Sequence, residues 1–377
     1  TVAPTAALTS VLAVGVAAGL VVIPLAGLEI LLADRATLSE FNTESGLRGY
    51  AFVILKGVAL ATTVWAVAAA GSVDPRRDPA ASRRFVTLLA IVAVAVTALV
   101  FNPLVNPRFS FAAAVIALLF VAVRPHFHQL KPWAILAFPA ALFFVFPNLK
   151  ALSDADARAE FFERMGSVDL DYLTSVDFDA FQTAANAVRY VEEVGLLGIQ
   201  QLVGSLLFFV PRSIWPDKPF GSGLVVFDEL GYWYVNVSMP LPMEFFLAAG
   251  TLGLVLGMVA VGGLVARLES ACLRAGRVVG RTPADVFVAL AGGFAIITMR
   301  GSLAAVAVFV GIPLAWAVGV AWFAAARRDE GAGAAAAPAD PPASSFGDWR
   351  DRFVHATRRA RGRPRVGIGR ASCRERV

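Results

Sequence analysis

Cysteine, histidine and charged residues are scarce in this 377-residue chain. The two cysteines, Cys272 and Cys373, provide no disulfide framework and no cysteine-rich metal site. Charged residues make up 16% of the chain, against about 25% in an ordinary soluble domain. The formal net charge of +5 comes from arginines in short loops and in the tail, so membrane topology explains it and we expect no nucleic-acid partner.

What the chain has instead is long apolar runs. Hydrophobic residues make up 58% of it and the mean hydropathy is +0.68, which places the protein in a lipid bilayer. A helix needs about 20 residues to cross a hydrocarbon core of roughly 30 Å. Eight stretches qualify with some tilt or help from flanking residues: 7–32, 51–70, 85–101, 109–123, 133–146, 245–266, 286–299 and 303–325. The fold class predicted is therefore an all-α polytopic membrane protein with about eight transmembrane helices.

Lysine and arginine in short loops indicate the sidedness of the spans, because they are retained in the cytoplasm. The basic segments are 76–84, 124–131, 267–281 and the stretch from Arg327 onward. Alternation across eight spans then places outside the segments 34–50, 102–108 and 147–244 and the turn at Arg300. Both ends are predicted to be cytoplasmic.

The chain is predicted to divide into five parts. Residues 1–146 hold the first five spans, with further helices expected upstream, and 147–244 form a large external loop. Residues 245–326 hold spans six to eight. A disordered, basic cytoplasmic tail is expected over 327–367, and 368–377 (IGRASCRERV) resemble translated sequencing adapter, so they are excluded as an artefact.

Two helices are expected within the large loop. Residues 178–194 have the pattern of an amphipathic helix with Asp177 or Asp179 as its N-cap. Residues 195–210 are apolar, but if they crossed the membrane the basic segments that follow would face outward. We therefore interpret 195–210 as a re-entrant or interfacial helix.

Positively charged side chains are usually kept on the cytoplasmic side, so a cation on the external side indicates a nearby anion that it binds. Four meet this description: Arg108, Arg212, Lys218 and Arg300. Arg108 follows a turn restricted by two prolines, and Arg300 precedes a Gly-Ser hinge between two uncharged spans. Each either binds a substrate anion or contacts lipid headgroup phosphate by snorkelling. Lys56, near the outer end of the second span, has the same two interpretations.

The segment FVPRSIWPDKPFGSG, residues 209–223, is the most specific stretch of the chain. Its three prolines restrict the backbone and hold Arg212 and Lys218 on a stiff, extended loop. Guanidinium offers two parallel donors to phosphate oxygens, so such a loop suits a pyrophosphate. The alternative is a structural connection with Trp215 as an anchor at the membrane interface.

The longer run GIQQLVGSLLFFVPRSIWPDKPFGSG, followed by PLPMEFF and a glycine-rich span, resembles the Wzy-type oligosaccharide repeat unit polymerases. The NPRF turn and the late Arg-Gly-Ser are also similar to that group. The resemblance covers about residues 102–302 and implies the C-type membrane glycosyltransferase architecture, in a bacterial plasma membrane with the active site on the external face.

The resemblance implies glycosyl transfer without a metal or other cofactor, from a polyprenyl-pyrophosphate-linked oligosaccharide, with a chain-length regulator as protein partner. Cations must stabilise the leaving pyrophosphate, and a carboxylate must take a proton from the acceptor hydroxyl. Expected catalytic residues are Glu244, Arg300, Arg212 and Asp217, with Glu244 preferred over Asp217 as the base. Expected pyrophosphate-binding residues are Arg108, Arg212, Lys218 and Arg300. Glu244 has a structural alternative, as an acid that complements a helix dipole.

Three aromatic residues are candidates for stacking on sugar rings: Trp215, Tyr232 and Trp233. The alternative is an aromatic belt at the membrane interface, which is the more common reason for such residues.

Two other functions fit the same composition. An O-antigen ligase shares the donor, but by resemblance it uses an external histidine, and His126, His128 and His355 all fall on the predicted cytoplasmic side. A lipid-linked sugar transporter would carry internal repeats and polar residues at mid-membrane, whereas here the polar residues concentrate in one external loop.

Overall fold

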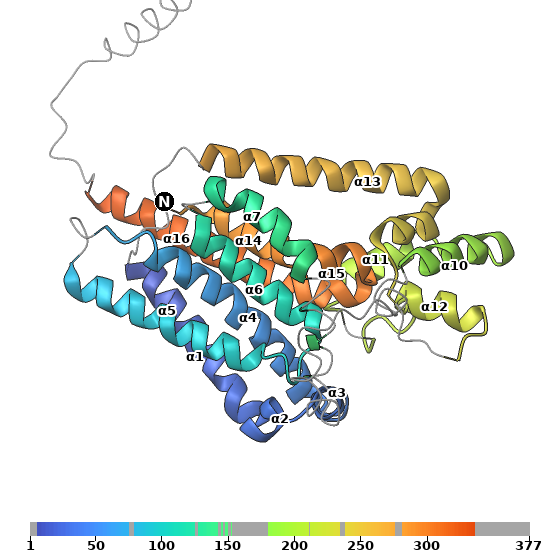
Figure 1. Ribbon diagram of the computed structural model, residues 1–377, viewed down its shortest axis with the longest axis horizontal. Coiled ribbons are helices and arrows are strands. Elements are labelled where there is room, and N and C mark those ends of the chain that lie inside the picture. The colour runs from blue at the N-terminus through green and yellow to red at the C-terminus, as the bar shows by residue number, and fades with distance from the viewer. Residues whose placement is uncertain are drawn as a thin grey trace, which may run out of the picture. The chain divides into compact units, whose positions relative to one another are not determined.

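The computed structural model describes residues 6–74, 79–124, 127–141, 145, 148–149, 152, 180–210, 212–233, 238–275 and 281–335. The chain divides into two units, residues 1–326 and 327–377, and the arrangement described below is that of the first. All regular structure in the described residues is helical (Figure 1). The helices are α1 (Ala6–Ala26), α2 (Leu28–Leu32), α3 (Arg35–Glu44), α4 (Leu47–Ala70), α5 (Ala80–Val100), α6 (Arg108–Val123), α7 (Phe127–Ala140), α10 (Ala180–Glu193), α11 (Gln200–Leu206), α12 (Ser222–Glu229), α13 (Leu241–Ala275), α14 (Pro283–Gly293), α15 (Ala295–Arg300) and α16 (Leu303–Ala335).

Five of these helices are long and apolar enough to cross a membrane, so the protein is a multi-pass helical membrane protein. They contain the candidate spans Ala6–Ala26, Leu47–Ala70, Ala80–Val100, Leu241–Ala271 and Val306–Ala326. Helices α6 and α14 are apolar but shorter. The predicted span over 133–146 overlaps α7, and its last residues lie largely outside the described part.

The core of the unit is a bundle in which α4 is central. Helices α1 and α5 pack on α4, and α6 and α14 pack on α4 and on each other. Small side chains allow the close approach that helix packing in membranes favours: Gly15 lies against Thr62, and Gly293 lies against Ala113 and Ala117. Hydroxyl groups of neighbouring helices also bond, since Thr63 Oγ1 and Thr97 Oγ1 are 2.7 Å apart.

Two predicted single helices are interrupted. The stretch 7–32 breaks at Gly27, whose φ of +90° is open to glycine but strained for other residues, and so forms α1 and α2. The helix predicted over 286–299 is interrupted at Phe294, which separates the 11-residue α14 from the 6-residue α15. The segment 34–50, predicted to be an external loop, is partly helical, because Asp34 caps α3 by accepting a hydrogen bond from the Thr37 N–H at 2.8 Å.

Helix α13 bends sharply near its start. Ala249 and Gly250 leave helical geometry, with φ of +65° at Gly250, and this separates a short first leg, 241–248, from the long leg, 251–275. The break frees the Leu247 carbonyl, which accepts a hydrogen bond from the Leu197 N–H at 2.9 Å. The first leg is thereby turned toward α10 and α11 (Figure 1).

The described part of the large loop forms a small core of its own. Helix α10 occupies most of the expected amphipathic segment, while the proposed caps Asp177 and Asp179 lie outside the described residues. Helix α11 has only 7 residues, too few to span a bilayer. Buried side chains from α10, α12 and the first leg of α13 pack together, and they include Tyr190, Phe227 and Leu247. This core holds the start of α13 in place.

Candidate active site

Glu244 lies on the first leg of α13 and is 0% exposed. Its Oε1 accepts a hydrogen bond from the Leu303 N–H at 2.7 Å. Leu303 begins α16, and the first N–H groups of a helix have no partner within the helix. Glu244 therefore caps α16 from another helix, which is a variant of the structural role that the sequence left open for it.

The second oxygen of Glu244 is different. Oε2 is buried and forms no hydrogen bond within the described residues. The hydroxyl groups of Ser222, at the start of α12, and Ser302, just before α16, lie close enough to the same carboxyl to interact with it by hydrogen bonding. Both Oγ atoms are buried, and neither contact has the distance and angles of a well-formed hydrogen bond. Three polar oxygens from separate segments thus meet in one buried place.

Arg300 and Arg108 lie at the same end of the bundle. Arg300 ends α15, two residues before Ser302, and its guanidinium carbon is 4.9 Å from the centroid of the Phe109 ring. The guanidinium carbon of Arg108 is 6.0 Å from that centroid. The structure therefore brings together two predicted cations from distant parts of the chain, around a ring that the sequence did not single out.

The turn before Arg108 is fixed by buried amide and ammonium groups. Asn106 donates through Nδ2 to the Val100 and Asn102 carbonyls at 2.8 and 2.9 Å. Its Oδ1 accepts a hydrogen bond from Lys56, which is 7% exposed and lies 4.6 Å from the Phe101 ring centroid. Lys56 therefore does not snorkel to the surface; it ties α4 to the turn.

The proline-rich loop is closed by Lys218. Its ammonium donates to the Leu207, Phe208 and Val210 carbonyls at 3.0, 2.8 and 3.0 Å. Burial of the ammonium, and then the nearby Arg212 guanidinium, lower the pKa of Lys218. In this geometry its donors serve the loop backbone.

The other charged residues of this loop face outward. Arg212 lies over the Phe220 ring at 3.9 Å and is exposed, as is Asp217, while Trp215 is half-buried. Within the described residues no hydrogen bond or ion pair joins Arg212, Asp217 or Lys218 to Glu244. No direct bond to Glu244 thus supports a shared site for these three residues, and their substrate roles stay predictions.

The candidate sugar-stacking residues are in contrasting positions. The Tyr232 ring packs on Phe227 with centroids 4.7 Å apart, and its hydroxyl donates to Asn186 Oδ1 at 3.3 Å. Trp233 is 92% exposed. Tyr232 therefore helps build the loop core, whereas the Trp233 ring is accessible to a ligand.

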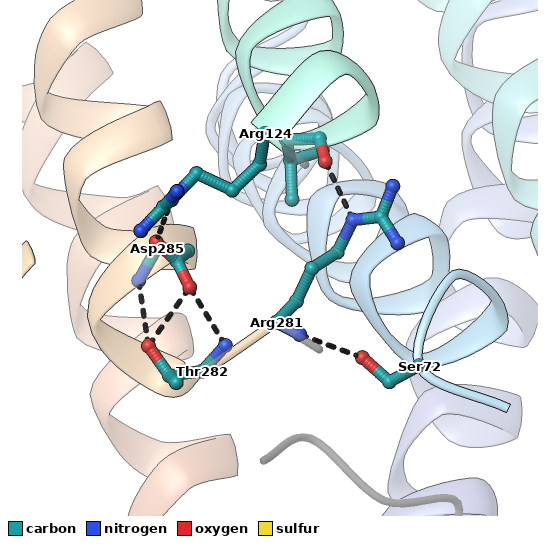
Figure 2. A network of polar contacts seen from close by, with 6 residues as sticks. Ser72, Arg124, Arg281, Thr282 and Asp285 are labelled. Carbon is teal, nitrogen blue, oxygen red and sulfur yellow. Dashed lines mark hydrogen bonds and ion pairs between the residues drawn. The ribbon is translucent and has the colours of Figure 1, made fainter. Parts of the chain in front are cut away.

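A second polar cluster lies at the other end of α6 and α14 (Figure 2). Asp285 forms a capping box with Thr282: its Oδ2 accepts from the Thr282 N–H at 2.8 Å and the Thr282 hydroxyl at 2.9 Å. Its Oδ1 pairs with Arg124 Nε at 2.5 Å. Both oxygens of this buried carboxylate are therefore engaged.

Arg281 completes that cluster. Its guanidinium donates to the Val121 and Ala122 carbonyls at 2.7 and 2.8 Å, where α6 ends. Figure 2 shows its backbone N–H donating to Ser72 Oγ, at 3.1 Å. A cation at these last carbonyls also complements the helix dipole. The predicted cytoplasmic arginines Arg124 and Arg281 thus share one end of the bundle, opposite Arg108 and Arg300.

Sequence reasoning missed three members of the site: Ser222, Ser302 and Phe109. All three lie in stretches quoted above, namely the Arg-Gly-Ser hinge, the segment 209–223 and the NPRF turn, but only the charged residues and Trp215 of these stretches were given a role. Their roles were missed because only the fold brings Ser222 to Glu244 and Phe109 to Arg300.

No family model, no curated protein and no solved structure matches this chain.

Proposed function

We propose that this protein polymerises polyprenyl-pyrophosphate-linked oligosaccharide repeat units by metal-independent glycosyl transfer. One observation carries the proposal: a fully buried carboxylate with an uncommitted oxygen lies at the bundle end that also holds Arg108 and Arg300. A base for the acceptor and cations for the leaving pyrophosphate are the two requirements of this reaction.

In the proposed step, Glu244 Oε2 takes the proton of the acceptor hydroxyl. The acceptor oxygen forms a bond to the anomeric carbon of the donor glycan, and the bond from that carbon to the carrier pyrophosphate breaks. The electron pair leaves on the pyrophosphate, whose growing negative charge Arg300 and Arg108 stabilise. Arg212 is proposed to contact the same pyrophosphate, and Lys218 to hold the loop that carries Arg212. Asp217 remains the second candidate base, and Trp233 is proposed to stack on sugar.

We further infer eight membrane crossings, both ends in the cytoplasm, and a site on the external face of a bacterial plasma membrane. The inference is supported by the distribution of arginines in the sequence. It is also supported by the grouping of Arg124 and Arg281 at one bundle end and of Arg108 and Arg300 at the other.

The test uses purified protein in liposomes with the lipid-linked repeat unit isolated from source cells that lack the gene. With a metal chelator present, we expect a ladder of lipid-linked products of increasing length and release of polyprenyl pyrophosphate. Transfer of glycan only to a different lipid acceptor would indicate a ligase instead. Movement of the intact unit across the bilayer without elongation would indicate a transporter.

A further inference from the structure

We propose that Ser222 and Ser302, together with Glu244, form the subsite that binds the hydroxyl groups of the acceptor sugar. This inference rests on the proposed function, since it names what enters the Glu244 cluster. It assigns the acceptor to the three buried oxygens and leaves the donor pyrophosphate to the arginines.

The first argument is burial. Ser222 and Glu244 are fully buried and Ser302 nearly so. A buried polar group without a partner costs about 1–3 kcal/mol, and folded proteins keep few such groups. Here three gather at one point: the Glu244 carboxyl and the two serine hydroxyls interact with one another, but Oε2 and both Oγ atoms lack a well-formed hydrogen bond to the described residues. A ligand with several hydroxyl groups would supply the partners that these three atoms lack.

The second argument is the chemistry of the three groups. A hydroxyl both donates and accepts, and an ionised carboxylate only accepts. Two hydroxyls beside one carboxylate match adjacent hydroxyls on a sugar ring: one gives its proton to Glu244, and its neighbours bond to the serines. None of the three is a cation, so the cluster suits a polyol better than a phosphate.

The third argument is how the chain holds the two serines together. Gly221, directly before Ser222, lies so close to Ser302 that a Cβ atom there would be 3.2 Å from Ser302 Oγ. The preceding residue, Phe220, is fixed because its carbonyl accepts a hydrogen bond from Gln201 Nε2 on α11. The start of α12 is thus pressed against the start of α16, with Glu244 bonded to the same place.

The experiment separates acceptor from donor with a probe: the repeat unit carrying a short alkyl glycoside in place of the pyrophosphate. This probe can accept a glycan but has no leaving group. Its equilibrium binding to purified protein is measured by calorimetry, and its KM is measured in single-transfer reactions. The variants are Ser222→Ala and Ser302→Ala. The control is Ser205→Ala, a buried serine whose hydroxyl donates to the Gln201 carbonyl at 3.0 Å within α11.

Each site variant should weaken binding of the probe, and raise its KM, by about 5- to 100-fold, the range expected for one buried hydrogen bond to a ligand. The KM of the pyrophosphate-linked donor and the thermal unfolding midpoint should not change, and the control variant should behave as wild type. A purely structural role for the serines would instead lower the unfolding midpoint and affect donor and acceptor alike.

Probe binding that is equal in wild type and both site variants, or absent from wild type, would overturn the subsite. A wild-type protein that binds the probe through these serines and yet elongates nothing would remove the proposed polymerase and leave the subsite standing. The two proposals therefore fail in different measurements.

Discussion

Two buried carboxylates, Glu244 and Asp285, lie at opposite ends of the bundle and have much in common. Each accepts a hydrogen bond from a backbone N–H near the start of a helix, α16 for Glu244 and α14 for Asp285. Their remaining contacts differ. Asp285 has an arginine partner and no uncommitted oxygen, whereas Glu244 has an oxygen that bonds to nothing in the described residues.

This difference in hydrogen bonding indicates a structural role for Asp285 and a functional role for Glu244. A buried charge that is paired and fully hydrogen-bonded has all its interactions satisfied within the protein. Its removal destabilises the fold, because its partner is left as an unpaired buried charge. A buried carboxylate with an unused oxygen is costly to keep, and such local conflicts tend to persist at functional sites. Burial and capping alone would have ranked the two residues equally. The unused oxygen is what distinguishes them.

The largest effect is expected at Glu244. Glu244→Gln keeps a carbonyl oxygen for the Leu303 N–H but removes the base, so turnover should fall roughly 100- to 10,000-fold while the fold is retained. Glycan ladder length and the thermal unfolding midpoint measure the two properties on the same preparation. Glu229→Gln, an exposed change at the end of α12, is the matched control. A wild-type ladder from Glu244→Gln would exclude Glu244 as the base and make it a helix cap only.

Asp285 should give the opposite pattern. Asp285→Ala leaves Arg124 without its buried counter-charge and removes one half of the capping box of α14, so stability should fall by about 3 kcal/mol. Turnover per folded molecule should stay near the wild-type value, because Asp285 lies in the first turn of α14, whereas Arg300 lies at the end of α15, the helix that follows. The measurement is thermal unfolding of Asp285→Ala, Arg124→Ala and the double variant, whose non-additivity isolates the pair. Loss of turnover in folded Asp285→Ala would contradict the separation of the two ends.

Arg300 should affect turnover less than Glu244. A charged hydrogen bond is worth roughly 1.5 to 3 kcal/mol, so Arg300→Ala should cut turnover by about ten- to several-hundred-fold. Arg300→Lys keeps the charge but loses the planar fork, so it should recover only part of the rate. Ladders are compared at matched membrane abundance. A full-length ladder from Arg300→Ala would remove Arg300 from the site.

The helical class of the fold followed from the sequence, but the helix breaks did not. Apolar runs of sufficient length predict spans because backbone groups in lipid must bond within a helix. Glycine inside such a run is ambiguous. Gly27 and Gly250 adopt positive φ and end their helices, whereas Gly15 and Gly293 stay helical and allow neighbouring helices to approach closely. Only tertiary contacts decide between these two uses.

The candidate site was predictable where charge was unusual. Glu244 and Arg300 were identified because charges at the end of an apolar span are costly and need a reason. Ser222 and Ser302 were not, because serine is common at helix starts and in turns. Lys218 was assigned to a substrate anion, yet its ammonium bonds to three carbonyls of its own loop. A sequence shows which side chains carry charge, but not which of them the backbone already uses.

The smallest effect is expected at the C-terminal tail. Truncation after Asp329 removes a segment rich in glycine, alanine, proline and arginine, whereas the partners of Glu244, Arg300 and Asp285 described above lie within residues 1–326. Ladder length and the unfolding midpoint should both match the full chain, because the sequence predicts a disordered tail and the removal of such a segment is tolerated. Measuring membrane abundance alongside separates catalysis from insertion. A shorter ladder at normal abundance would mean that the tail acts on the Glu244 end of the bundle, and a lower unfolding midpoint would mean that it supports the Asp285 end.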